Sequence, residues 1–219
     1  QTQELADETM SRLKDLGCQP QFFAIDRTGI GQGVHDNIRR QWSQKVMGAQ
    51  NLRGGAEPAG IMGINYSETA TDTTVCEEDT KTPKELYDGI RSEVWFATGR
   101  FFEYGYLKIG NGVDTETIQE LIERQGGSPA GRGKLLQVES KDSYKSRGNK
   151  SPDRADAFTM LVQCARITGG IKPKSPDTVA LVENPPLHAM KDSFALKMGD
   201  SIDLGFIPKL PKELALDKD

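Results

Sequence analysis

Carboxylates stand at two places in this sequence where a divalent cation would suit them. Asp26 follows the short apolar run of residues 21–25, which reads as a buried strand. An ionised carboxylate at the end of such a strand is costly unless it is paired, hydrogen-bonded or bound to a metal. The alternative, which residue type alone favours, is a turn-forming aspartate that accepts hydrogen bonds from the amides of Thr28 or Gly29.

The second acidic centre is Asp153 with Asp156. Their i, i+3 spacing places both carboxylates on one face of a helix, where they can share one hard cation. The alternative is an ordinary helix N-terminus, since Ser151-Pro152-Asp153 is a typical start and acids there complement the helix dipole. That alternative explains Asp153 better than Asp156, which borders the apolar stripe that begins at Phe158.

Between these centres, residues 132–154 carry a local excess of positive charge. Seven basic residues stand against three acidic ones, namely Arg132, Lys134, Lys141, Lys145, Arg147, Lys150 and Arg154 against Glu139, Asp142 and Asp153. Most charge runs are solvated loops. A basic loop beside an acidic metal centre is, however, what phosphodiester chemistry requires, because carboxylates hold Mg²⁺ or Mn²⁺ while Lys and Arg attract the phosphate backbone.

Composition limits the other possibilities. The 219 residues include 28 basic and 32 acidic residues, a net charge of -4, which excludes a generally basic coat for nucleic acid. Three widely spaced cysteines and two histidines argue against a structural zinc site and indicate a reducing compartment. Neither an apolar run of the roughly 20 residues that span a membrane nor a signal peptide is present, so we expect a soluble intracellular protein. The glycines of residues 28–33 and of Gly133-Lys134 match neither phosphate-binding fingerprint.

The elements that must position these residues alternate between strands and helices, which predicts an α/β fold. Helices are expected over residues 3–16, 33–44, 83–104, 114–125 and 151–168, and strands over 21–25, 46–48, 61–66 and 135–139. Residues 49–60, 67–82, 126–133 and 140–150 read as loops, of which 67–82 should be exposed. Residues 1–170 should form one domain, and residues 171–219, which hold 6 of the 11 prolines, an extended tail.

Several segments resemble the large terminase subunits of tailed bacteriophages, over about residues 3–168. Residues 26–34 are similar to the family's D-x-x-G-x-G segment, and residues 63–67 and 92–96 follow in the family's order. The most specific match is to the family's "E-S-K … R-G … S-P-D-x-A-D-A" block, which corresponds to Glu139-Ser140-Lys141, Arg147-Gly148 and Ser151-Pro152-Asp153-Arg154-Ala155-Asp156-Ala157.

This resemblance implies a ribonuclease H-like nuclease domain, a mixed sheet flanked by helices, that cuts concatemeric double-stranded DNA during packaging. Asp26 and Asp156 would be metal ligands, with Asp153 as a neighbour or further ligand, for two Mg²⁺ or Mn²⁺ ions roughly 4 Å apart. The DNA contacts expected from the basic segment are Lys134, Lys141, Lys145, Arg147 and Lys150. The implied partners are an ATPase domain of the same protein, the portal and the small terminase subunit, at the procapsid packaging motor in the host cytoplasm.

One departure from the family pattern sets a further expectation. Such nucleases open with a strand that bears another essential Asp, whereas this chain opens with a helix, so that ligand and its strands are expected upstream of residue 1. The isolated chain should therefore cleave DNA poorly. Two alternatives stay open: another ribonuclease H-like nuclease, such as a resolvase or transposase, and a module that docks to DNA or the portal without chemistry. Metal bound between Asp26 and Asp156 would favour the nuclease, whereas carboxylates splayed apart and salt-bridged to Lys or Arg would favour the docking module.

Overall fold

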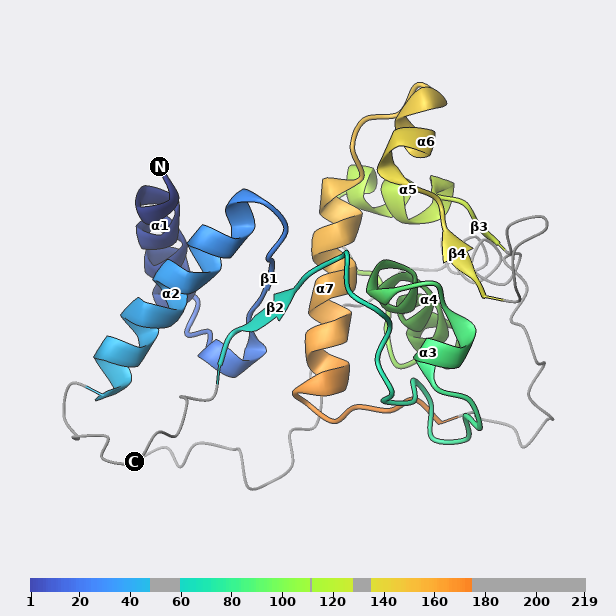
Figure 1. The fold of residues 1–219 in the computed structure, drawn as a ribbon, viewed down its shortest axis with the longest axis horizontal. Helices are drawn as coiled ribbons and strands as arrows, with labels where there is room; N and C mark the ends of the chain where they lie inside the picture. The colour runs from blue at the N-terminus through green and yellow to red at the C-terminus, as the bar shows by residue number, and fades with distance from the viewer. Residues whose placement is uncertain (48–59, 111, 128–134, 175–219) are drawn as a thin grey trace.

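The computed structural model describes residues 1–47, 60–110, 112–127 and 135–174 (Figure 1). Helices account for about half of these residues, so the chain is a mixed α/β protein, as expected. The helices are α1 (Thr2–Asp15), η1 (Pro20–Phe22, a 3-10 turn), α2 (Ile30–Met47), α3 (Pro83–Leu86), α4 (Ile90–Glu103), α5 (Thr115–Glu123), α6 (Lys141–Ser146) and α7 (Asp153–Ile167). The strands are β1 (Ala24–Asp26), β2 (Met62–Ile64), β3 (Gly126–Gly127) and β4 (Gln137–Val138).

The strands are shorter than the sequence suggests and form two separate sheets within the described residues. β1 pairs in parallel with β2, with Asp26 opposite Ile64, and β3 pairs antiparallel with β4. The mixed sheet that the family resemblance implies is therefore not seen as one sheet in the described residues. Pro20 explains the late start of β1, because its fixed φ suits the first position of the 3-10 turn that takes up Phe22. The expected strand at residues 46–48 was also wrong, since α2 continues through Met47.

The helix expected over residues 83–104 is broken into two. Pro83 begins α3 as predicted, with Thr82 and Glu85 forming a capping box. The chain then extends at Tyr87, which forms an isolated parallel bridge with Leu136. The amide of Leu136 donates to the carbonyl of Leu86 at 2.7 Å. This pairing with a distant segment breaks the helical hydrogen bonding, and the apolar periodicity on either side of the break does not reveal it.

Two segments that were predicted to be loops differ from that prediction, one by forming a helix and the other by being partly buried. Residues 140–150 contain α6, whose N-cap Ser140 accepts a hydrogen bond from the amide of Ser143 at 3.1 Å. The Thr-rich segment 67–82 has no long helix or strand, but it is not exposed throughout. Val75 and Cys76 are buried in a cluster with Phe96 and Phe101 of α4. Apolar residues isolated among polar ones carry no periodic signal, so their burial was not predicted.

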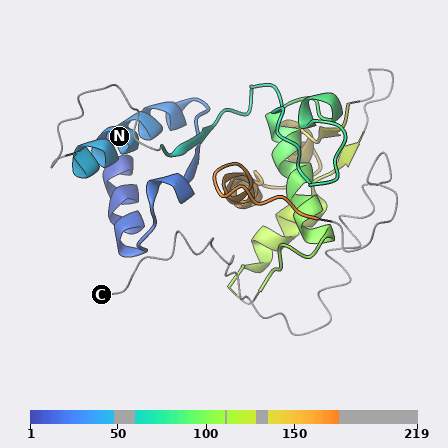
Figure 2. The same cartoon turned by 90° about the horizontal axis from the view of Figure 1, so that it is seen from below.

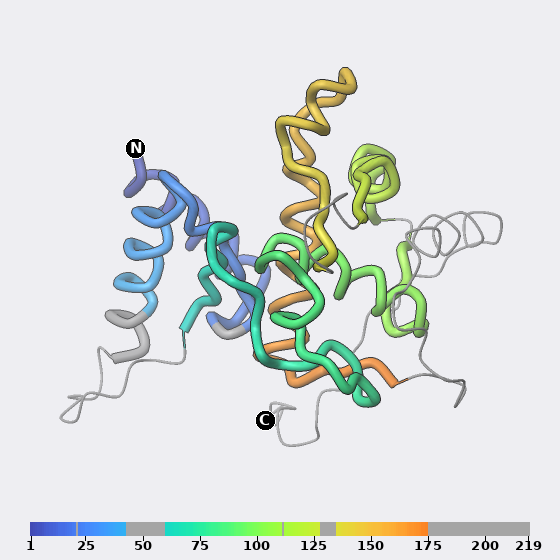
Figure 3. Tube along the Cα trace, turned by 45° about the vertical axis from the view of Figure 1, so that its right-hand side comes forward, coloured from blue at the N-terminus to red at the C-terminus, as the bar shows by residue number. Residues whose placement is uncertain are grey.

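α7 is the element around which the rest is arranged. Viewed end-on in Figure 2, it lies between the α1–α2 pair with the β1–β2 sheet on one side and α4 on the other. It packs against β1 and η1 on the first side and against α4 and α5 on the second. Figure 3 follows the backbone from β2 through residues 65–82 to α3 and α4, which returns the chain to the other side of α7. A helix with neighbours on both sides can bring residues from both into one site.

α4 is buried almost all round, as its weakly amphipathic sequence allows. Trp95 and Phe102 pack with Leu121 of α5 and Ala155 of α7. None of the described helices is long and apolar enough to cross a membrane. The tail predicted from residue 171 is described only through Lys174, and residues 175–219 lie outside the described part.

Candidate functional site

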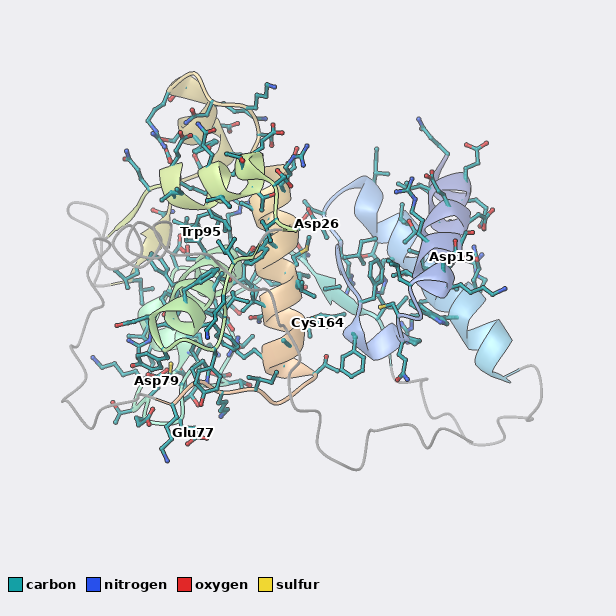
Figure 4. All side chains as sticks on the ribbon, turned by 180° about the vertical axis from the view of Figure 1, so that it is seen from behind. Asp15, Asp26, Glu77, Asp79, Trp95 and Cys164 are labelled. Atoms are coloured by element: carbon teal, nitrogen blue, oxygen red, sulfur yellow. The ribbon has the colours of Figure 1, made fainter. Side chains whose placement is uncertain are left out.

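Asp26 ends β1 at the side of α7 that faces the β1–β2 sheet, opposite the side that faces Trp95 (Figure 4). Its Oδ1 accepts a hydrogen bond from the amide of Thr28 at 2.7 Å, so the turn-forming role considered as an alternative is confirmed. All three residues of β1 are half-buried rather than buried. The cost of placing a carboxylate here is therefore lower than the sequence suggested. No ion pair of Asp26 is found among the described residues.

The two glycines of the D-x-x-G-x-G segment have separate structural reasons. Gly29 has φ +59°, a left-handed conformation that most other side chains disfavour. Gly31 lies where a Cβ would stand 1.9 Å from the backbone oxygen of Asp26. Only glycine therefore lets α2 begin directly over the end of β1, which ties the first turn of this helix to the position of Asp26.

We expect Gly31→Ala to destabilise the protein by about 1–3 kcal/mol, because the added methyl meets backbone atoms that have no room to yield. Gly33→Ala is the matched control, since its Cβ would meet only the side chain of Thr2, at 3.3 Å. Alanine at that position also favours helix formation, by up to about 1 kcal/mol. Denaturant unfolding of the two variants tests the difference, and equal stability would contradict the role given to Gly31.

Asp156 lies in the first turn of α7 and is buried, with 9% of its side chain exposed. Both of its carboxylate oxygens are bound by cations. Oδ1 lies 2.7 Å from Nη1 of Arg124, and Oδ2 lies 2.7 Å from Nζ of Lys141. The burial of Asp156, which the adjoining apolar stripe suggested, is thus accompanied by the charged partners that a buried acid needs.

Arg124 belongs to the interior of the protein. None of its side chain is exposed, its guanidinium carbon lies 4.8 Å from the centre of the Trp95 ring, and its Nε donates to the carbonyl of Glu139 at 3.0 Å. Its Nη2 is buried and has no acceptor among the described residues. Arg124 follows α5, which also supplies Glu120, whose Oε2 accepts from the amide of Ala155 at 2.8 Å. α5 therefore fixes both the start of α7 and the orientation of Asp156.

Lys141, at the start of α6, reaches both acids of α7. Its Nζ lies 3.0 Å from Oδ1 of Asp153 as well as 2.7 Å from Asp156. Burial tends to lower the pKa of Lys141, but hydrogen bonds to Asp156 and Asp153 outweigh it and raise the pKa. Asp153 is exposed, and hydrogen bonds from Ser151 and then Lys141 lower its pKa. The predicted pairing of the two acids on one helix face is thus present, with an ammonium group between them.

Tyr66, just beyond β2, contacts the backbone of Asp156. Its side chain is buried, and its hydroxyl donates to the backbone carbonyl of Asp156 at 3.4 Å. Burial raises the pKa of Tyr66, and the charges of Asp156 and Asp26 raise it further. The packing of α7 against β1 brings into one region two elements that bear acids far apart in sequence.

The basic residues expected to contact DNA fall into three groups. Lys134 lies outside the described residues. Lys141 is paired with the two acids, and Arg147 lies 2.6 Å from Glu139 and donates to the carbonyl of Glu123. Lys145 and Lys150 are exposed, with no ion pair recorded among the described residues. Part of the local positive charge is thus neutralised within the protein, and the DNA contacts stay a prediction.

The described residues contain no group of three or more His, Cys, Asp or Glu side chains placed to hold a metal ion. Asp26 and Asp156 supply hard oxygen donors of the type that Mg²⁺ and Mn²⁺ prefer. Asp153 is turned to Ser151 and Lys141. Asp26 and Asp156 lie on two elements that pack against each other, and both oxygens of Asp156 are paired with Arg124 and Lys141.

Sequence reasoning missed two residues of this site. Arg124 comes at the end of a short amphipathic helix, where an arginine reads as an exposed, dipole-complementing residue. Tyr66 ends a strand candidate and reads as a core aromatic. Only Lys141, within the basic segment, had a sequence signal, and that signal indicated a phosphate contact rather than a contact with the acids.

No protein-family model and no curated protein sequence matches this chain. The grounds for a functional assignment are therefore the residues, their geometry and the motif resemblance.

Proposed function

We propose that this chain is the metal-dependent endonuclease domain of a viral DNA-packaging terminase, with a ribonuclease H-like fold. The observation that carries the proposal is the packing of β1, which ends at Asp26, against α7, whose first turn bears Asp156. The two carboxylates that the family resemblance identifies lie on β1 and on α7, and these elements pack against each other. If Asp26 served only its turn and Asp156 only a helix N-terminus, nothing would require these two acids to lie on elements that pack together.

The residues supply the type of oxygen donor that a divalent cation prefers, but fewer donors than such a site needs. Asp26, whose Oδ1 accepts from Thr28, and Asp156, whose oxygens face Arg124 and Lys141, would hold it. Such a cation, when bound, makes a water nucleophilic and stabilises the leaving oxygen of a phosphodiester. The described residues contain no group of three or more acidic, His or Cys side chains that could hold a metal ion, and Asp153, the neighbouring acid of α7, is bound by Lys141.

The chain's own residues would do three things in this reaction. Arg124 and Glu120 hold Asp156 and the first turn of α7 in place. Gly29 and Gly31 allow the tight turn that presents Asp26 at the end of β1. Lys145 and Lys150, together with Lys134, would bind the phosphate backbone of double-stranded DNA. Contacts with an ATPase domain, the portal and the small subunit at the procapsid in the host cytoplasm are part of the same proposal.

A second candidate function is a module that docks to DNA or the portal without chemistry. The ion pairs of Asp156 with Arg124 and Lys141 favour it specifically, because they already neutralise the carboxylate. Under this alternative Asp26 serves only its turn, for which the Thr28 amide is sufficient. The nuclease proposal is preferred because it also explains why β1, which ends at Asp26, packs against the helix that bears Asp156.

Titration of the 219-residue chain with Mn²⁺ distinguishes the two candidates. We expect Mn²⁺ binding that weakens more than about tenfold in Asp26→Asn, since changes merely adjoining metal ligands already cost 10–100-fold. Asp142→Asn is the matched control, because Asp142 is an exposed acid in the first turn of α6. Equal Mn²⁺ affinity in the wild type and Asp26→Asn would overturn the nuclease proposal and leave the docking module.

A further inference from the structure

Arg91, in the first turn of α4, differs from the arginines that bind carboxylates elsewhere in the protein. Its guanidinium carbon lies 5.6 Å from the centre of the Tyr66 ring. Its Nε is buried without an acceptor, whereas its two terminal nitrogens are not buried. No side-chain hydrogen bond or ion pair joins Arg91 to another of the described residues. One face of the guanidinium is therefore covered by the ring, and its outer edge is free to bind a ligand.

The acidic residues nearest to Arg91 in the sequence are engaged elsewhere. Asp88 accepts a hydrogen bond from the hydroxyl of Ser92, and Glu93 is paired with Arg166. A cation in the first turn of a helix also opposes the helix dipole. Neither an ion pair nor the stability of α4 therefore accounts for an arginine at this position.

Tyr66 links the position of Arg91 to the start of α7. The Tyr66 hydroxyl donates to the backbone carbonyl of Asp156 at 3.4 Å, so one side chain contacts both Arg91 and the first turn of α7. The amide of Ile90 donates to the carbonyl of Glu68 at 3.1 Å, which fixes the start of α4 beside the segment that follows β2. The guanidinium is thus held in place close to the proposed nuclease site.

We propose that Arg91 binds a backbone phosphate of double-stranded DNA through its terminal nitrogens. The inference rests on the nuclease function proposed above and adds a contact from α4 to those expected from the basic segment. A planar guanidinium can place two N–H groups on two phosphate oxygens at once, and an aromatic ring beneath it fixes the plane of this fork. A phosphate bound here lies against the same tyrosine that contacts the start of α7.

A phosphate contact and a packing role predict different results for one substitution. If Arg91 only covers the Tyr66 ring, its removal lowers stability and leaves the salt dependence of DNA binding unchanged. For B-DNA, each neutralised phosphate contributes about 0.9 to the slope of log affinity against log salt concentration. We therefore expect Arg91→Gln to reduce this slope by about 0.9, so that between about 50 and 200 mM salt the variant loses about 3.5-fold less affinity than the wild type.

Fluorescence anisotropy of a short labelled DNA duplex, titrated in EDTA with the full 219-residue chain over a range of salt concentrations, measures the slope. Arg91→Lys keeps the charge and should keep the slope. Lys14→Gln is the matched control, because it removes the same charge from an exposed position in the last turn of α1, and it should also keep the slope. Circular dichroism confirms that each variant is folded. Arg91→Met, whose apolar stem can still cover Tyr66, replaces Arg91→Gln if the latter does not fold.

The outcomes separate this inference from the function on which it rests. DNA binding by the wild type with an equal slope in Arg91→Gln would overturn the phosphate contact and leave the nuclease proposal standing. An equal reduction of the slope in Lys14→Gln would show a general charge effect and would also overturn the contact. No DNA binding by the wild type at any salt concentration would overturn both the contact and the DNA-binding part of the proposed function.

Discussion

Asp26→Asn is expected to reduce DNA cleavage by more than about a hundredfold in the longer protein that the terminase proposal implies, because it removes a direct metal ligand. ATP hydrolysis should stay largely intact, since that chemistry would belong to another domain. The longer protein is the right one to assay, because the 219-residue chain alone is expected to cleave poorly. Plasmid nicking with Mg²⁺ or Mn²⁺, measured alongside ATP turnover, gives both quantities.

Asp156→Asn should reduce cleavage to the same extent as Asp26→Asn, but the reason for the loss would be harder to assign. The substitution leaves Arg124, whose side chain is fully buried, without its carboxylate partner, so a loss of stability accompanies the loss of activity. Asp26 has no such ion pair among the described residues and is the cleaner test. Asp142→Asn, an exposed acid on α6, should retain full cleavage. Equal loss of cleavage and ATP hydrolysis in Asp26→Asn would indicate misfolding and contradict the assignment.

Arg166→Met is expected to destabilise the protein by about 3–5 kcal/mol, the largest effect on stability that the structure predicts. Arg166 of α7 is paired with Glu93 of α4, and neither side chain is exposed. Glu93 also accepts from the amide and the hydroxyl of Thr71, and Arg166 donates to the carbonyl of Thr73 at 2.7 Å. Methionine would leave the Glu93 carboxylate buried without a counter-charge and would release the segment 67–82 from α7.

Arg12→Met provides the matched control, because it also breaks an Arg–Glu pair, in this case within a single helix. Arg12 and Glu8 are both mostly exposed on α1, so the loss should be below about 0.5 kcal/mol. Urea unfolding of the two variants, with the midpoint and slope compared with the wild type, measures the difference. A loss below about 1 kcal/mol in Arg166→Met would show that the buried pair does not hold α4 and α7 together.

The elements that the sequence predicted best are those whose bounds are set by residues close to them along the chain. α1 and α7 begin and end within two residues of their predicted bounds, because helical periodicity and terminal residues are read along the chain itself. The capping box at Thr82 and the turn at Asp26 are local in the same way. The close approach that requires glycine at position 31 is to Asp26, only five residues earlier. The requirement is therefore visible in the sequence as the D-x-x-G-x-G motif.

The errors lie where a distant segment decides the local structure. The break between α3 and α4 depends on the bridge of Tyr87 with Leu136, which no periodicity around residue 87 reveals. The burial of Val75 and Cys76 depends on packing against α4. The partners of Asp156 come from beyond α5 and from α6, and nothing in the sequence of α7 indicates Arg124.

The sequence by itself determined that two acidic centres and a basic segment belong to one α/β protein, because residue types and short spacings carry that information. Only the tertiary structure decided that the Tyr66 hydroxyl binds the backbone carbonyl of Asp156, and that an internal lysine and arginine already bind the Asp156 carboxylate. The physical reason is that a charge is governed by every group within a few ångströms of it. Those neighbours are brought together by the packing of α7 against β1, α4 and α5, which no local pattern encodes.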